Sequence, residues 1–394
     1  MLPLLLVALL PVLGPLLRPL LRRGLGHLVH FPRQEVRQLR GPGSAVCKLA
    51  RLRRFDVEGC MKPSDRKLQV LNLRMLLGAA AVAWPLAARA QQPAVPVIGY
   101  LYAGSSEPVA DLIAVFRHGL AENGYIESQN VMIEYRFAGG RYDRLPDLAT
   151  DLVRRQVAAI VTPPSTAAAL AAKAATQTIP IVFAVTDDPA KLGLVASLSR
   201  PGGNATGVNF LVAELVAKRL ALLHELAPAA TRVVGLVNPN NANTESVVRD
   251  LTQAALALGM RLDVLHARDS HEIEAAFAAL VGMKVDALLV GPDSVFQNRR
   301  VQLATLAARH AVPAVFPVRE FVEVGGLISY GTSLKNVYFQ LAVYTGRILK
   351  GVMPGELPVV QSTKFELVIN LPTARAIGLE IPPTLLARAD EVIE

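Results

Sequence analysis

The chain has 394 residues, of which 52% are hydrophobic and 5% aromatic, which is ordinary for an Ala/Leu/Val-rich α/β protein of two or three domains. Its formal net charge of +9 originates in the first 90 residues, because residues 91–394 carry 26 Lys/Arg and 28 Asp/Glu. Nucleic-acid binding is therefore excluded as the explanation of the basic pI. Both cysteines, Cys47 and Cys60, precede Met61, so the body of the protein offers neither a disulfide nor a thiolate metal site.

Two segments precede this body. Residues 1–60 begin with a Leu-rich run that three prolines interrupt, so a membrane anchor is less favoured than an extension upstream of a natural start at Met61. From Met61 a basic stretch, an apolar run to Trp84 and the small residues around Ala90 follow in the order of a secretory signal peptide. We expect cleavage after Ala90 and a periplasmic location.

The body opens with alternating strand and helix patterns. Strands are predicted at 97–102, 131–135, 158–162 and 179–184, and helices at 111–123 and 141–156. This βαβαβαβ order is typical of a doubly wound parallel sheet. After 179–184 we expect a polar loop, a short helix from Pro189 and, past the turn 201–204, an extended crossover at 206–211.

The same order recurs about 130 residues later. Strands are predicted at 233–237, 261–266, 287–290 and 314–317. The segment 157–166 aligns with 285–294 position for position, each a strand followed by a polar helix start. A period of this length indicates two domains of one topology rather than a solenoid.

Further crossings follow the second copy. An extended segment is predicted at 325–331, a helix at 335–350, and a last crossing after Pro354 that ends in a helix from Pro383. We therefore expect an α/β protein of two doubly wound parallel-sheet lobes joined by a multi-segment hinge. Lobe 1 is predicted to hold residues 95–204 plus 327–356, and lobe 2 residues 205–326 plus 357–394.

Catalytic patterns are missing from the sequence. It has no G-x-S-x-G, P-loop, G-x-G-x-x-G or H-E-x-x-H motif, and the histidines after Met61 are scattered over different elements. The pair Asp187 and Asp188 is the one candidate for acid–base chemistry, and without a nucleophile or metal partner we favour a binding role for it. We predict no catalytic residue, metal or cofactor.

Polar and aromatic residues at strand ends and crossings are the candidate ligand contacts, since open α/β sheets bind ligands at the carboxyl ends of their strands. They are Tyr102, Ser105, Ser106, Ser165, Thr166, Asp187, Asp188, Asn209, Asn238, Asp293, Phe316 and Tyr330. Hydroxyls and free amides at a helix start suit a carboxylate, and an aspartate suits an ammonium, so the set fits a zwitterion such as an amino acid.

Several of these candidates have a structural alternative. Ser165 and Asp293 stand at helix starts, where the alternative is a plain N-cap, and for Asp293 the cap and the ligand contact are equally favoured. The three aromatic candidates are as well suited to the core as to stacking on a ligand. For Asp188 we expect a charge-assisted hydrogen bond to the ligand, and the alternative is that it caps the helix that starts at Pro189.

From about Leu76 to the C-terminus the sequence resembles the bacterial ABC transporter substrate-binding proteins with a type I periplasmic binding fold. The resemblance is carried by residues 83–93, 142–146, 179–183, Asp188-Pro189, 191–195, 199–207, 218–226 and Asn238-Pro239-Asn240. It implies that a small solute, for some relatives an aromatic amino acid, is delivered to an ABC permease in the inner membrane. We expect a monomer. The alternatives are a doubly wound enzyme using Asp187 or Asp188, and a soluble ligand-sensing domain.

Overall fold

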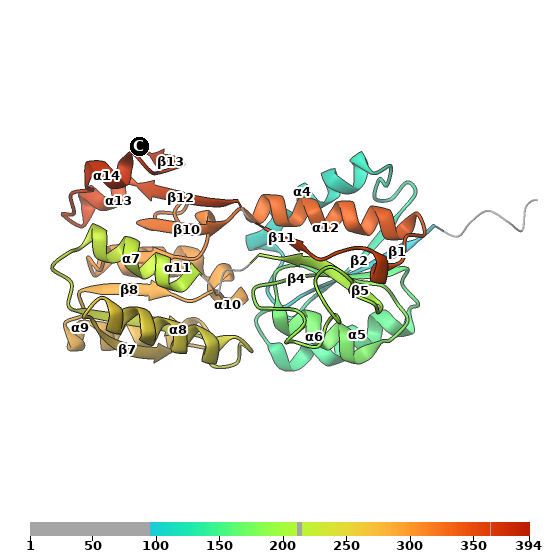
Figure 1. The fold of residues 1–394 in the computed structure, drawn as a ribbon, viewed down its shortest axis with the longest axis horizontal. Coiled ribbons are helices and arrows are strands. Elements are labelled where there is room, and N and C mark those ends of the chain that lie inside the picture. Colours follow the sequence, from blue (N-terminus) through green and yellow to red (C-terminus); the bar gives the residue numbers. More distant parts are fainter. Residues whose placement is uncertain (1–94, 211–214, 363) are drawn as a thin grey trace, which may run out of the picture. The chain divides into compact units, whose positions relative to one another are not determined.

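The computed structural model describes residues 95–210, 215–362 and 364–394. The extension and the signal peptide expected before residue 91 lie outside these ranges, so both stay predictions. The described chain builds two sheets flanked by helices (Figure 1).

The first sheet has six strands in the order β11-β5-β4-β3-β1-β2, and every pairing is parallel. Its strands are β1 Val97–Tyr102, β2 Met132–Phe137, β3 Ala159–Thr162, β4 Ile181–Val185, β5 Ala205–Asn209 and β11 Val360–Gln361. Helices α5 (Leu145–Arg154) and α6 (Thr166–Ala175) cover one face, and α4 (Ala110–Glu122) and α12 (Leu334–Leu349) cover the other (Figure 1).

Alternation along the strands explains this double cover. In β4, Val182 and Ala184 pack on the α4–α12 side, and Ile181, Phe183 and Val185 pack on the α5–α6 side. A strand that is buried on both faces reads as a continuous apolar run, which is why this stretch was predictable from sequence.

The second sheet has seven strands in the order β13-β12-β10-β9-β8-β6-β7. They are β6 Arg232–Val237, β7 Arg261–His266, β8 Ala287–Val290, β9 Ala314–Phe316, β10 Ile328–Thr332, β12 Phe365–Asn370 and β13 Glu391–Ile393. The order β10-β9-β8-β6-β7 repeats β5-β4-β3-β1-β2 of the first sheet, which confirms two doubly wound lobes of one topology. Within these pairings, only β10 with β12 is antiparallel.

Helices and short 3-10 turns complete the described part. They are α7 Val216–Leu226, α8 Thr244–Ala257, α9 Ser270–Met283, α10 Ser294–Asn298, α11 Arg300–Arg309, α13 Leu371–Ala376, α14 Pro383–Leu386, η3 Glu107–Val109, η4 Tyr142–Arg144, η6 Arg319–Phe321 and η7 Pro354–Glu356. Helices α7 and α8 pack in one core cluster with the second sheet, while α9 and α11 pack on its other face.

Strand pairing divides the lobes differently from the expected boundaries. We expected residues 205–209 and 360–361 in lobe 2 and 328–332 in lobe 1. However, β5 pairs with β4 and β11 with β5 in the first sheet, and β10 pairs with β9 in the second. The glycine turns that precede β5 and β10, with Gly202 at φ 74° and Gly325 at φ 102°, lead into the next strand of the same sheet. The chain therefore changes lobes after β5, β10 and β11.

Two smaller expectations also differ. No regular helix starts at Pro189; residues 188–193 form turns in which Leu192 N donates to Asp188 O. The helix from Pro383 is only four residues long, and the chain ends instead in β13, which pairs with β12.

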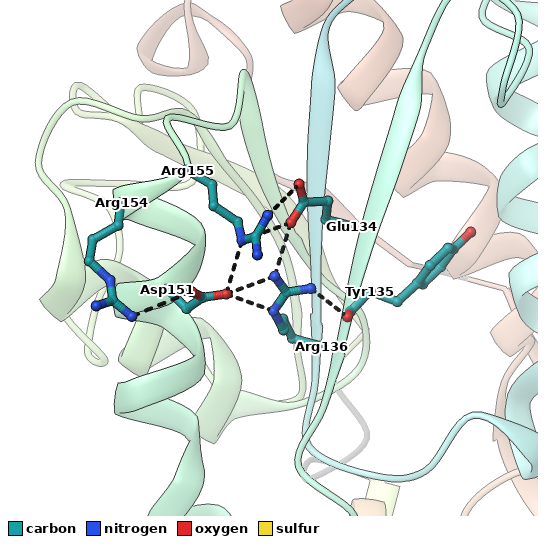
Figure 2. Close-up of polar contacts among 6 residues, drawn as sticks. All are labelled: Glu134, Tyr135, Arg136, Asp151, Arg154 and Arg155. Carbon is teal, nitrogen blue, oxygen red and sulfur yellow. Dashed lines mark hydrogen bonds and ion pairs between the residues drawn. The ribbon is translucent and has the colours of Figure 1, made fainter.

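Charged side chains cover the edge strand β2. Arg136 donates to Asp151 Oδ2 at 2.7 and 2.9 Å and to Glu134 Oε2 at 2.9 Å, and Arg155 contacts the same two carboxylates (Figure 2). An exposed edge strand is a template for pairing with another chain, and a row of charges opposes such pairing.

Candidate functional site

A cavity lies where the carboxyl ends of strands from both sheets meet. The cavity has a volume of about 60 Å³. This volume is several times the roughly 10–15 Å³ that one water molecule requires. Its lining residues follow β1, β3, β4, β5, β6, β8 and β9, and two further ones belong to α12. This is the position at which open α/β sheets bind ligands.

The apolar wall of the cavity is defined here by six lining residues of the first lobe, and Val318 of the second lobe adds to the apolar lining. The six residues are Tyr102, Val109, Leu112, Phe210, Leu334 and Tyr338. The aromatic rings of Tyr102 and Tyr338 are both almost wholly buried. Because burial of apolar surface is the main source of affinity for an apolar group, this wall suits a hydrocarbon or aromatic part of a ligand.

The N-terminus of α6 forms the polar edge on the first lobe. Ser165 is its N-cap in extended backbone, and the Ser165 hydroxyl accepts a hydrogen bond of 3.2 Å from Ala168 N. The backbone N–H groups of Thr166 and Ala167 lie in the first turn of α6, before Ala168. N–H groups in the first turn of a helix have no acceptor within the helix. A ten-residue helix with these amides and the Ser165 hydroxyl can hold an anion.

Asp293 forms the polar edge on the second lobe, as the N-cap of α10. Its carboxylate accepts hydrogen bonds from Asn238 Nδ2 at 3.0 Å, Asn241 Nδ2 at 2.7 Å and Val295 N at 2.8 Å, and from Tyr142 Oη at 2.7 Å. Burial raises the pKa of Asp293, and these hydrogen bonds oppose the rise. A cationic ligand group beside Asp293 would favour the charged carboxylate in the same way.

Hydrogen bonds across the cavity join the two lobes. Tyr142 reaches Asp293, Asn243 Nδ2 donates to Thr186 Oγ1 at 2.9 Å, and Ser294 Oγ donates to Pro164 O at 3.3 Å. Each bond pairs a group of the first lobe with a group of the second. They hold the cavity closed, and all of them have to break if the lobes separate to admit a ligand.

The described residues show neither a metal cluster nor a membrane helix. They contain no group of three or more His, Cys, Asp or Glu side chains placed to hold a metal ion. Within the same ranges no helix has the length and apolarity needed to cross a bilayer.

Comparison with known proteins assigns the architecture to a family. Residues 106–393 match the family model of the ABC transporter substrate binding proteins. The chain belongs to this family. The match confirms the resemblance expected from sequence. It makes the chain a member of a family of solute-binding proteins, which bind small molecules and work with ABC permeases, rather than of an enzyme family.

Relatives of this substrate-binding protein include receptors with defined ligands. A tyrosine-binding protein of Clostridioides difficile is 26% identical over 268 residues, which cover 67% of this chain and 76% of the relative. An ABC domain of Streptococcus pneumonia, solved in complex with L-Trp, is 26% identical with a TM-score of 0.68, covering 76% of this chain and all of that one. A conserved domain protein of Vibrio cholerae is 29% identical over the same shares, with a TM-score of 0.70. These structures confirm the expected type I periplasmic binding fold.

Four of the predicted contact residues lie in the cavity wall of the substrate-binding protein: Tyr102, Ser165, Thr166 and Asp293. For Ser165 and Asp293 the structure shows an N-cap and a place in the wall together, so the two interpretations do not compete. Asn238 does not line the cavity, but its side-chain amide donates a hydrogen bond to Asp293.

The other predicted residues lie elsewhere. Ser105 faces a wider polar cleft beside the cavity, and Ser106 is exposed at the start of η3. Asp187 accepts hydrogen bonds from Thr186 and Ser246, while Asp188 accepts one of 2.9 Å from Ala190 N in the turn after β4. Asn209, Phe316 and Tyr330 belong to strands β5, β9 and β10, outside the cavity wall; Phe316 stacks on Phe321.

Sequence reasoning missed most of the residues that line the cavity. Asn241 and Asn243 belong to the asparagine-rich run that begins at Asn238, so extending the strand-end rule by a few residues would have found them. Leu334 and Tyr338 carried no such signal, because helical periodicity shows only that they are buried and not against what.

Proposed function

We propose that this substrate-binding protein captures an α-amino acid with an aromatic or large apolar side chain. The supporting observation is the placement, around one cavity, of a helix N-terminus, a carboxylate and an apolar wall. After export and cleavage behind Ala90 the protein would act in the periplasm and deliver this ligand to the permease of an ABC importer.

The two charged ends of an amino acid have separate partners in the wall. The ligand carboxylate would accept hydrogen bonds from the amides of Thr166 and Ala167 and from the hydroxyl of Ser165. The ligand ammonium would donate to Asp293, which the hydrogen bonds of Asn238 and Asn241 hold in place. The Ser294 to Pro164 bond brings these two helix starts together, as an α-amino acid with its two groups on one carbon requires.

The side chain of the ligand would lie on the apolar wall. Tyr102 and Tyr338 provide rings for edge-to-face or offset contact, and Leu112 and Leu334 fill the space beside them. Relatives that bind tyrosine and L-Trp support an aromatic ligand for this chain.

A thermal-shift screen of the twenty amino acids on the protein starting at Gln91 tests the proposal, followed by calorimetry on the best ligands. At 100 times its dissociation constant a ligand stabilises the folded protein by about 2.7 kcal/mol. Aromatic amino acids should give the largest shifts, and decarboxylated or N-acetylated analogues should give none. Stabilisation by sugars alone, or turnover of a stabilising compound, would contradict the proposal.

Export has a separate test. N-terminal sequencing of the protein from a periplasmic fraction should return Gln91 as the first residue. Recovery of the uncleaved chain from the cytoplasm would refute the predicted signal peptide without affecting the ligand assignment.

A further inference from the structure

The junction of α10 and α11 carries polar atoms that no part of the described chain satisfies. Gln297 Nε2, Asn298 Oδ1 and Arg300 Nε are all buried without a hydrogen-bond partner among the described residues. Buried polar groups in folded proteins are nearly always paired. Three exceptions within four positions point to a polar partner from outside the chain.

Gln297 is the member of this cluster that reaches the ligand cavity. It is 7% exposed and lines the cavity together with Asp293 and Ser294 of the same helix. Among the described residues that line the cavity, Gln297 Nε2 is the only buried side-chain nitrogen or oxygen atom that has no hydrogen-bond partner.

The cluster borders the apolar wall of the cavity at Tyr102. A Cβ placed on Gly104 would lie 2.2 Å from Asn298 Nδ2 and 2.7 Å from Tyr102 Cε1, so Asn298 and the Tyr102 ring meet at the same point of the backbone. The C-terminal end of α10, at Asn298, therefore lies close to the Tyr102 ring.

The opposite end of α10 faces the groups assigned to the ligand backbone. Ser294 Oγ contacts Pro164 O, directly before α6. Gln297 lies three residues further along the helix, about 4.5 Å along its axis. A ligand whose charged groups contact the start of α6 and Asp293 would have its side chain available to Gln297.

We propose that Gln297 donates a hydrogen bond to an acceptor oxygen on the ligand side chain. This inference rests on the proposed function and assigns its specificity. Because Gln297 Nε2 lines the cavity and is an N–H donor, only an acceptor satisfies it. A site with buried donors discriminates against a ligand that leaves them unpaired, so a phenol side chain should bind more tightly than a phenyl one.

Calorimetric titration of L-tyrosine and L-phenylalanine into the wild-type protein and into Gln297→Met tests this. The wild type should bind L-tyrosine at least about tenfold more tightly than L-phenylalanine. Methionine has a similar volume and no amide, so Gln297→Met should bring the two affinities to within about threefold, mainly by weakening tyrosine. Gln297→Leu should do the same, provided its melting temperature shows that it is folded.

The matched control is Gln177→Met, because the Gln177 side chain is exposed and donates to Lys173 O away from the cavity. It should leave the tyrosine-to-phenylalanine ratio unchanged. Equal affinities in the wild type, or an unchanged ratio in Gln297→Met, would overturn the role of Gln297 and leave the proposed function intact. Binding of neither tyrosine nor phenylalanine, with another aromatic or large apolar amino acid bound, would overturn only the role of Gln297. Failure of the wild type to bind any of these amino acids would overturn the proposed function.

Discussion

Removal of the Tyr142 hydroxyl tests whether the bonds across the cavity contribute to ligand affinity. Tyr142 belongs to η4 of the first lobe, and its hydroxyl donates to Asp293 Oδ2 of the second lobe at 2.7 Å. Tyr142→Phe keeps the ring and deletes only this bond. Because the bond exists only while the lobes are together, its loss should affect the closed, ligand-bound state and not the folding of either lobe.

The magnitude follows from what remains at Asp293. A hydrogen bond to a charged group contributes about 1.5–3 kcal/mol. The carboxylate keeps its donors Asn238, Asn241 and Val295, so the lower end of that range applies. Since 1.4 kcal/mol is a factor of ten, Tyr142→Phe should weaken the binding of L-tyrosine or L-tryptophan about tenfold.

Calorimetry for affinity and a thermal melt without ligand decide the matter on the same protein. Tyr135→Phe is the control, because its hydroxyl accepts a 3.1 Å bond from Arg117 at the edge of the first lobe, away from the cavity. It should bind like the wild type. Unchanged affinity in Tyr142→Phe would refute the reasoning, and so would a fall in affinity matched by an equal fall in the stability of the apo protein.

Three further changes probe closure, pH dependence and a predicted contact. Gly104→Ala should weaken ligand affinity in a titration, because its Cβ would lie 2.2 Å from Asn298 of the other lobe, whereas Gly282→Ala, with no atom within 4 Å, should not. Burial raises the pKa of Glu320 from 4.5 to about 7, so the folded state binds the carboxyl proton of Glu320 more tightly than the unfolded state does. The free energy of unfolding should therefore fall by about 3 kcal/mol as the pH rises from about 4.5 to about 7. Urea titrations at several pH values should show no such fall in the free energy of unfolding of Glu320→Gln. An identical fall in the variant would contradict the role of Glu320. Asp188→Ala should lower the stability by about 1 kcal/mol and leave affinity intact, since this carboxylate caps a turn; lost affinity would instead restore Asp188 to the site.

Local patterns in the sequence determined the two doubly wound lobes. Strands such as 181–185 are buried on both faces and therefore read as unbroken apolar runs, and the recurrence of their order showed the duplication. The rule that ligands meet the carboxyl ends of strands also selected Ser165 and Asp293, each the third residue after the end of β3 or β8.

Pairing between distant segments was decided only by the tertiary structure. A glycine turn before a strand does not reveal which sheet the strand will join, so β5 and β10 were assigned to the wrong lobes. Asp293 and Tyr142 are 151 positions apart, and Tyr338 lines the same cavity as Tyr102 because its helix, α12, packs on the first sheet. Such contacts depend on how the faces of whole elements pack, and the periodicity of one segment carries no information about its partner.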